Sequence, residues 1–324
     1  MNSDLTVFRC PSTSEVLRYD EAGQQLCSRS ASFPVVASIP RFVPKENYAA
    51  DFGLQWNTFS KTQLDSFVGQ PITETRLSRC FDGLLPEVRG RLVLEAGSGA
   101  GRFTEILLKH GATVHSFDYS TAVEANARNN GHSDRLTLAQ ADIRSIPYSR
   151  ASYDFVVCLG VLQHTPSPEA SIKHLWDMVK PGGRLVVDHY IFKWRNVLPP
   201  PIGGAGWLWR RVLLALPSSW RMPMVRRIVG FWFPVHWMMR DSLLMQRILR
   251  RLSPVHFYYP SLPLGTRDRF LEWAVLDTHD ATTDYFRHHR SVEQVRRSLE
   301  ALGAVDIVCR EGGNGVEAIC RKPR

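Results

Sequence analysis

The stretch Leu92-Val-Leu-Glu-Ala-Gly-Ser-Gly-Ala-Gly101 decides the fold of this 324-residue chain. Apolar residues predict a buried strand over Arg91 to Leu94, and a helix is expected directly after the glycines, over Arg102 to His110. Glycines carry no Cβ, so a ligand that bears a nucleoside can lie against the backbone of such a turn. The stretch therefore predicts a strand, a turn and a helix that bind a nucleoside-bearing cofactor.

The spacing of the glycines separates two classes of cofactor. A dinucleotide site needs G-x-G-x-x-G, with a pyrophosphate at the helix N-terminus. Here the glycines are Gly97, Gly99 and Gly101, and Arg102 takes the place of the third dinucleotide glycine. Glu95, two residues before the turn, would repel a pyrophosphate but suits a ligand with an ammonium and a sulfonium group. The pattern favours S-adenosylmethionine, although any tight turn between a strand and a helix can carry such glycines.

Two further acidic residues follow the next predicted strands. A strand over 113–117 ends at Asp118, about twenty residues after the first glycine, where a carboxylate can accept hydrogen bonds from both ribose hydroxyls. A strand over 135–139 leads to Asp142, whose carboxylate can bind the adenine edge together with the backbone N–H of Ile143. Each acid alone could be a solvated residue at the end of a strand. Acids at three successive strand ends favour a single cofactor site instead.

The remaining pattern completes a sheet. A buried strand is predicted over 152–159, and a Pro-Gly-Gly turn at 181–183 leads into a fifth strand. Near the C-terminus a helix over 291–302 precedes two strands, over 305–309 and 315–320. This order predicts an α/β sheet that an antiparallel pair of strands closes.

Together these segments resemble the class I S-adenosylmethionine-dependent methyltransferases, in particular the broad type 11 group that acts on small molecules. The likeness is carried by residues 93–103, 117–120, 141–143, 153–154, 159–166 and 180–184. Ser98 stands where many relatives have Cys, and Gln163 where a second His is common. The resemblance implies a Rossmann-like, seven-stranded methyltransferase sheet with helices on both faces, together with a small N-terminal β segment and a helical insertion.

The resemblance also implies the cofactor and its contacts. S-adenosylmethionine would be the methyl donor and would leave as S-adenosylhomocysteine. The residues expected to bind it are Gln55, Trp56, Glu95, Gly97, Gly99, Gly101, Arg102, Asp118, Tyr119, Asp142, Ile143 and Leu159. In relatives, the helix expected over 51–59 folds over the cofactor cleft. Alternatively, Phe52, Trp56 and Phe59 are simply the apolar face by which this helix packs on the core, and the sequence favours neither interpretation.

Residues 1–46 resemble a small zinc ribbon that has lost its metal. Relatives carry two C-x2-C pairs, whereas Thr13 and Ser30 here replace the second cysteine that would follow Cys10 and Cys27. Structural zinc requires four ligands, and only two thiols remain. We therefore expect no metal in this chain and a small β segment held by apolar packing.

The chain departs from the methyltransferase pattern at 194–262, between a core at 47–193 and its C-terminal completion at 263–324. Within 194–260 lie six of the nine tryptophans and ten arginines, against the single acid Asp241, so this segment accounts for the formal net charge of +9. Its longest apolar run, 228–239, is too short to span a bilayer. We expect a lid that contacts an anionic acceptor or, alternatively, a surface for an anionic membrane. We recognise no module that reads nucleic acid.

Three histidines are candidates for the chemistry. His164 follows the fourth strand, and we expect it to remove a proton from the acceptor, with a role in capping the turn as the alternative. His279 and His289 are further candidates, because they belong to a polar patch, 277–289, that we interpret as a loop facing the acceptor.

The predicted function is methyl transfer from S-adenosylmethionine to a small molecule, a sugar or a lipid- or carrier-linked acceptor. A scaffold that binds the cofactor without turnover is the alternative. We see no signal peptide, and the six scattered cysteines favour reduced thiols. These features predict a cytoplasmic protein, which would be peripheral at the membrane if the insertion contacts lipid.

Overall fold

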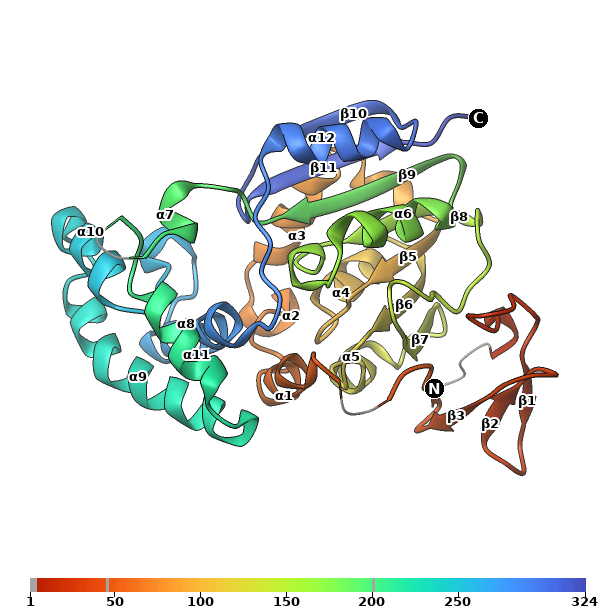
Figure 1. Ribbon diagram of the computed structural model, residues 1–324, viewed down its shortest axis with the longest axis horizontal. Coiled ribbons are helices and arrows are strands. Elements are labelled where there is room, and N and C mark those ends of the chain that lie inside the picture. The colour runs from red at the N-terminus through yellow and green to blue at the C-terminus, as the bar shows by residue number, and fades with distance from the viewer. Residues whose placement is uncertain (1–4, 45–46, 200–201) are drawn as a thin grey trace.

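The computed structural model describes residues 5–44, 47–199 and 202–324. Its central sheet consists of β5 (Leu92–Ala96), β6 (Thr113–Asp118), β7 (Leu136–Gln140), β8 (Tyr153–Cys158), β9 (Val179–His189), β10 (Val305–Glu311) and β11 (Val316–Arg321). The seven strands lie in the order β10-β11-β9-β8-β5-β6-β7 (Figure 1). This sheet confirms the predicted fold class.

The pairing of the strands determines which strand ends lie at the same edge of the sheet. Five neighbouring strands, from β9 to β7, are parallel, whereas β11 is antiparallel to both β9 and β10. The carboxyl ends of the parallel strands therefore meet at one edge of the sheet, where the glycine turn follows β5.

The predicted Pro-Gly-Gly turn is part of β9 instead. The register of β9 against β8 shifts between Tyr153 and Phe155, so that extra residues of β9 bulge out of the ladder. Gly182 has a φ of 79°, which favours glycine, and a Cβ on Gly183 would lie 2.8 Å from the carbonyl oxygen of Tyr153. Two glycines thus allow the strand to pass through the bulge without ending.

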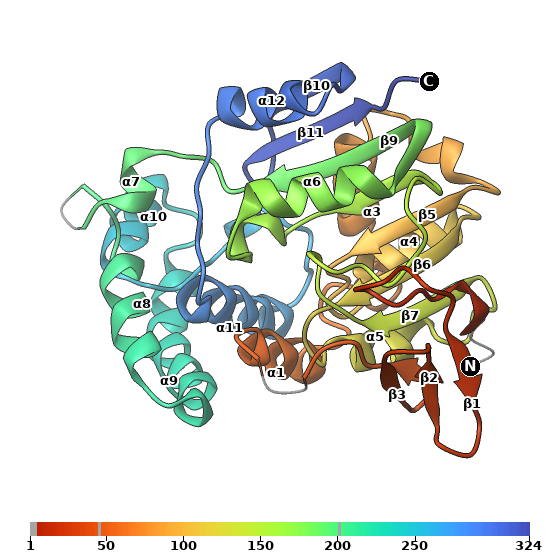
Figure 2. The same cartoon turned by 45° about the vertical axis from the view of Figure 1, so that its right-hand side comes forward.

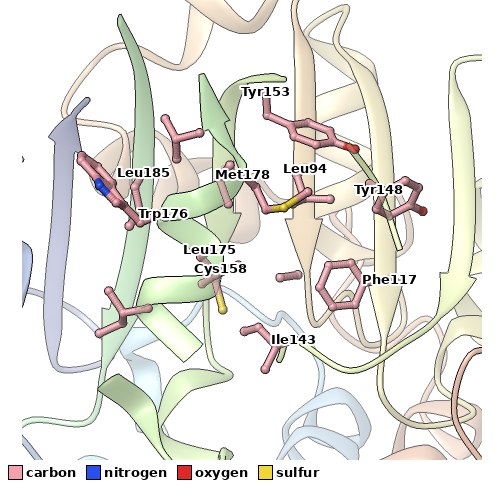
Figure 3. Packing of buried hydrophobic residues seen from close by; sticks show 14 of the residues in the cluster. Leu94, Phe117, Ile143, Tyr148, Tyr153, Cys158, Leu175, Trp176, Met178 and Leu185 are labelled. Carbon is pink, nitrogen blue, oxygen red and sulfur yellow. The ribbon is translucent and has the colours of Figure 1, made fainter. Parts of the chain in front are cut away.

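Helices cover both faces of the sheet. On one face lie α3 (Ile72–Cys80), α4 (Arg102–Lys109) and α5 (Val123–Asn130), and on the other lie α6 (Pro168–Met178) and α12 (Val292–Ala301) (Figures 1 and 2). Alternate residues of β5 serve the two faces: Val93 belongs to the buried cluster with Phe103 of α4, and Leu94 to the cluster with Leu175 of α6. Figure 3 shows the second cluster around Leu94, Phe117 and Leu175.

The N-terminal segment forms an antiparallel sheet of β1 (Arg18–Asp20), β2 (Gln25–Cys27), β3 (Ser32–Val36) and β4 (Ile39–Pro40). It packs against the core through Phe8, whose ring stacks on Tyr148 at 5.1 Å. Thr13 and Ser30 are exposed. Among the residues that the structure describes, no group of three His, Cys, Asp or Glu side chains is placed to hold a metal ion.

The insertion is helical. It comprises α7 (Trp194–Val197), α8 (Gly206–Ala215), α9 (Ser218–Met238) and α10 (Leu243–Leu252), and α8 and α9 pack on α11 (Arg267–Thr283). The insertion has its own buried apolar cluster, separate from those of the sheet. This cluster includes Phe233 of α9, Leu276 of α11, and Phe257 from the segment between α10 and α11. No helix within the described ranges is long and apolar enough to cross a membrane.

The polar patch at 277–289 differs from the predicted loop. Its first part, up to Thr283, is the last two turns of α11, and only the residues from Asp284 onward are irregular. The helix continues because Ala274, Val275 and Leu276 bury its apolar side against the insertion. The patch is therefore held by a rigid element.

Candidate active site

One cavity of about 1730 Å³ extends from the glycine turn to the insertion. Its sheet side is lined by the turn and by residues that follow β6, β7 and β8. Its other side is lined by α10 and the segment 253–258, and by Asp277 and Asp280 of α11. A cavity of this size holds a nucleoside-bearing cofactor together with a second molecule.

The three glycines of the turn meet three different neighbours. Gly97 and Gly99 line the cavity with φ angles of 79° and 53°. A Cβ on Gly97 would lie 2.2 Å from Cγ2 of Val161, and one on Gly99 would lie 3.2 Å from Cε2 of Trp56. Gly101 does not line the cavity; its Cβ would lie 2.2 Å from Oδ1 of Asn126, so it allows α4 to pack on α5.

Asp118 closes the turn and also lines the cavity. Its Oδ2 accepts a hydrogen bond from the backbone N–H of Gly99 at 2.9 Å, and Oδ1 accepts from the N–H and the hydroxyl of Ser120 at 2.8 and 2.7 Å. Burial raises the pKa of Asp118. A carboxylate has about four acceptor positions, so one remains for a ribose hydroxyl.

Glu95 lies beneath the turn and is not among the residues that line the cavity. Its Oε2 accepts hydrogen bonds from the hydroxyls of Thr104 and Ser116, while Oε1 is buried without a partner in the described chain. Burial raises the pKa of Glu95 to about 7. The carboxylate therefore sits behind the glycine backbone, and the direct contact predicted with the ligand ammonium group is not formed by this arrangement.

Arg102 offers a cation without a carboxylate partner. Its guanidinium lines the cavity, hydrogen bonds to Gln63 and lies 4.6 Å from the centre of the Phe103 ring, and among the described residues it makes no ion pair. Burial, followed by the charge of Arg76, lowers the pKa of Arg102 to about 10. Such a cation fits the carboxylate of the methionine part of the cofactor.

Two tyrosines line the cavity together with Asp142 and Ile143. Asp142 lines the cavity beside Ile143, but its carboxylate is engaged by Arg144, with 2.7 Å between Oδ2 and Nη2. Tyr48 and Tyr119 also line the cavity, and their rings stack at 4.8 Å. An aromatic pair at the end of the parallel strands offers a flat apolar surface to a base.

The two predicted residues of α1 (Ala50–Thr58) have different places. Trp56 lines the cavity against Gly99, whereas Gln55 is fully buried and does not line it. Oε1 of Gln55 lies 2.7 Å from Nδ1 of His279, and its Nε2 donates to Asp280 at 3.4 Å. Gln55 therefore joins α1 to α11 and does not line the cavity.

His164 and Asp284 form a buried pair beside the cavity. Nδ1 of His164 lies 3.4 Å from Oδ2 of Asp284 and 3.2 Å from the carbonyl oxygen of Phe286. Both are acceptors, so the proton belongs on Nδ1 and the lone pair on Nε2. Burial opposes the positive form of the ring, but the hydrogen bond and charge of Asp284 outweigh it and raise the pKa of His164.

Two arginines hold Asp284 in its charged form. Arg210 of α8 donates from Nε to Oδ1 at 2.7 Å, and Arg287 donates from Nε to Oδ2 at 2.7 Å. Burial alone would raise the pKa of Asp284, but chiefly through the charge of Arg287 the pKa falls to about 2. The insertion thus contributes directly to the electrostatics of His164.

The other two histidines do not share these features. His289 lines the cavity with its ring 6.0 Å from Tyr190, and burial lowers the pKa of His289 to about 4. His279 does not line the cavity, and burial lowers its pKa to about 4 as well. His279 is a structural contact of Gln55, which corrects its predicted catalytic role.

Several residues of the cavity were absent from the sequence prediction. Tyr190 follows β9 and donates from its hydroxyl to Oδ2 of Asp280 at 3.2 Å, and Arg76 of α3 pairs with Asp188 at 2.5 Å. Asp188 in turn accepts from the N–H of Gly160 at 2.6 Å. Tyr190 and Asp188 end a predicted strand at the cofactor edge, which was a usable signal, whereas nothing in the sequence around Arg76 marked it.

The comparisons with known proteins agree with this geometry. Residues 94–187 match the family model described as a methyltransferase domain. The ubiquinone biosynthesis O-methyltransferase of Coxiella burnetii is 33% identical over 100 residues, which are 30% of this chain and 43% of that protein. Its counterpart in Paracidovorax citrulli is 33% identical over 108 residues, or 32% and 44% of the two chains. The chain thus spans less than half the length of these curated relatives.

A solved S-adenosylmethionine-dependent methyltransferase from Mesorhizobium loti is 16% identical, with a TM-score of 0.43 over 75% of this chain and 96% of that one. The segment that matches the family model runs from β5 into β9 and contains the glycine turn and the parallel strand ends that line the cavity. Residues 94–187 therefore match the methyltransferase domain family.

Proposed function

We infer that this protein transfers a methyl group from S-adenosylmethionine to the oxygen or nitrogen of an acceptor bound between the sheet and the insertion. The continuous cavity, which the glycine turn, His164 and residues of the insertion all line, is the observation that supports this proposal most. Gly97, Gly99, Asp118 and Arg102 would hold the cofactor. The acceptor would be a small molecule, a sugar, or a lipid- or carrier-linked molecule.

The sulfonium of the bound cofactor supplies an electrophilic methyl group, so the chain must align the acceptor and remove its proton. Nε2 of His164 takes the proton from the acceptor hydroxyl or amine as the new bond to the methyl carbon forms. The cofactor would keep the electron pair of its carbon–sulfur bond and leave as S-adenosylhomocysteine. Asp284 stabilises the positive ring of His164 and keeps its Nδ1 proton in place.

The charge of the insertion side supports an anionic acceptor. Arg247, Arg250 and Arg251 of α10 line the cavity, and none of them pairs with a carboxylate within the part of the chain that the structure describes. They lie at i, i+3 and i+4, so they share one side of the helix. Guanidinium groups in this arrangement bind phosphate or carboxylate groups.

Turnover with a labelled methyl donor tests the proposal. Purified protein incubated with cell extract and methyl-labelled S-adenosylmethionine should transfer label to an extractable acceptor, and an Arg247→Gln/Arg251→Gln variant should raise the acceptor KM more than it lowers kcat. A chain that binds S-adenosylhomocysteine but transfers no label to any extract would support the scaffold without activity and contradict the proposal.

A further inference from the structure

The helix α9 is apolar on two opposite sides. Its inner side, formed by Met222, Val225, Val229 and Phe233, is buried on α8 and α11. A helix that is apolar all round is normally buried all round. Among the residues that the structure describes, none covers the outer side of α9.

The outer side carries a line of large apolar side chains, interrupted by Arg227. Trp220, Phe231 and Met238 are separated by eleven and seven residues, about three and two helical turns, and therefore lie along one line. Their exposed fractions are 61%, 74% and 67%. This line runs along a helix of 21 residues, which is about 31 Å long.

The chain after α9 extends this surface. Leu243 and Leu244, in the first turn of α10, are 71% and 66% exposed. In both views α9 lies on the outer edge of the molecule, on the side away from the sheet of β5 to β11 (Figures 1 and 2). We call Trp220, Phe231, Met238, Leu243 and Leu244 the outer apolar face.

Positive charge lies among these side chains. Arg227 is exposed on α9, two turns after Trp220 and about one before Phe231. Arg247 and Arg251 are exposed on α10. Within the described residues, the side chains of these three arginines make no hydrogen bond, ion pair or ring contact.

We propose that the outer apolar face docks on an anionic lipid bilayer, with its large apolar side chains below the headgroups and Arg227 among the lipid phosphates. A second copy of this chain, a nucleic acid and a lipid bilayer could each cover this face, and charge and apolar surface together distinguish them. A second copy would bring two basic surfaces together, because Arg227, Arg247 and Arg251 pair with no carboxylate within the described residues, and it would therefore be repelled. A nucleic acid would satisfy the arginines but would leave Phe231, Met238 and Leu244 in water.

A bilayer satisfies both groups at once, because an interfacial helix buries its apolar side at the acyl boundary while its arginines meet anionic headgroups. The helix α10 belongs to both the docking face and the cavity, since Leu243 and Leu244 begin it and Arg247, Arg250 and Arg251 line the cavity further along. Docking would therefore place the acceptor side of the cavity next to the lipid surface.

Co-sedimentation of the purified full-length chain with vesicles tests this proposal. We expect binding to phosphatidylcholine vesicles that contain phosphatidylglycerol to exceed binding to pure phosphatidylcholine vesicles by about tenfold or more at low salt. The triple variant Trp220→Ser/Phe231→Ser/Met238→Ser should bind the anionic vesicles about tenfold or more weakly than the wild type. Arg227→Gln should weaken binding about fivefold and reduce its salt dependence.

The matched control is Val16→Ser/Tyr19→Ser/Val36→Ser, which removes three exposed apolar side chains in and around the N-terminal sheet. This variant should bind vesicles as the wild type does. Both triple variants should keep the thermal unfolding midpoint and the affinity for S-adenosylhomocysteine, which shows that they are folded.

Three results would overturn the proposal. The wild type could fail to sediment with anionic vesicles, or the serine variant of α9 could sediment as well as the wild type. Alternatively, the wild type could be a stable dimer in sedimentation velocity that this variant converts to monomers. The assay contains no methyl donor, so its failure is separate from a failure of the proposed transfer.

Discussion

At the scale of single residues, the environment of His164 decides what the site can do. Its Nδ1 faces Asp284 and a backbone carbonyl, so Nε2 is left as the basic atom beside the cavity. The pattern around Gly160-Val-Leu-Gln-His164 pointed to this histidine. It could not point to Asp284, which is 120 residues away in the chain and reaches His164 because the segment after α11 lies beside the turn that follows β8, where the N–H of His288 donates to the carbonyl oxygen of Gln163.

His164→Ala should lower kcat by about a hundredfold or more, because it removes the proton acceptor. Affinity for S-adenosylhomocysteine should change little, since His164 is not among the residues that would hold the cofactor. A base acts in its neutral form, and the pKa of His164 is raised, so wild-type kcat should fall as the pH decreases through a value above 6.5. Asp284→Asn should move this acidic limb to lower pH. Full turnover by His164→Ala would exclude the catalytic role.

The buried Glu95 leads to a prediction about how the stability of the folded protein depends on pH. Its folded-state pKa, about 7, lies above the ordinary value of 4.5, so the folded protein holds a proton that the unfolded chain releases. Stability should therefore fall as the pH rises from about 4.5 to about 7, by up to roughly 3 kcal/mol. Glu95→Gln cannot ionise, so its thermal midpoint should exceed that of the wild type at pH 8 and match it near pH 5. Equal midpoints at both pH values would show that Glu95 stays charged in the folded protein.

At the scale of elements, the sequence predicted what local pattern can encode. The strands β5 to β8 and the helices α4 and α12 lie within a few residues of their predicted bounds, because apolar periodicity and glycine positions mark them. The Pro-Gly-Gly segment and the patch at 277–289 were misassigned for one reason. A register bulge in β9 and the burial of α11 against α9 both depend on partners far away in the chain.

The close contact between the glycine turn and Val161, a partner far away in the chain, can be tested by substitution. Gly97→Ala places a Cβ 2.2 Å from Cγ2 of Val161 at a φ of 79°, so it should weaken S-adenosylhomocysteine binding by about tenfold or more. Val161→Ala in the same chain removes the two Cγ atoms and should restore part of this loss, while the φ strain remains. Calorimetric titration of the two single variants and the double variant measures this coupling. Strictly additive effects would contradict the contact.

At the scale of the whole molecule, the insertion is joined to the cofactor side by polar contacts. Asp51 of α1 is buried and accepts hydrogen bonds from Ser218, at 2.5 Å, and from Arg221 of α9. Arg210 of α8 reaches Asp284 in the same way. The arginine-rich composition predicted a separate basic element, but it could not show that two of its arginines are used inside the protein and that others line the cavity.

Arg221→Gln removes the cation that pairs with the buried Asp51 and leaves it the hydrogen bond from Ser218, so it should destabilise the protein by about 2 kcal/mol or more. Limited proteolysis should then cut within 194–262 faster than in the wild type. Arg297→Gln is the matched control, since the Arg297–Glu293 pair is exposed and should contribute little. If both variants are cut and melt alike, the contact with Asp51 does not hold the insertion.

Calorimetric titration of the purified chain with S-adenosylhomocysteine tests the central claim most directly, because it needs no knowledge of the acceptor. We predict saturable binding to one site per chain in the micromolar range. The same titration of Asp118→Ala should show affinity at least about tenfold weaker, because the turn loses the carboxylate that accepts from Gly99 and Ser120. A folded wild-type chain that gives no saturable heat at millimolar ligand would contradict a cofactor site at this turn.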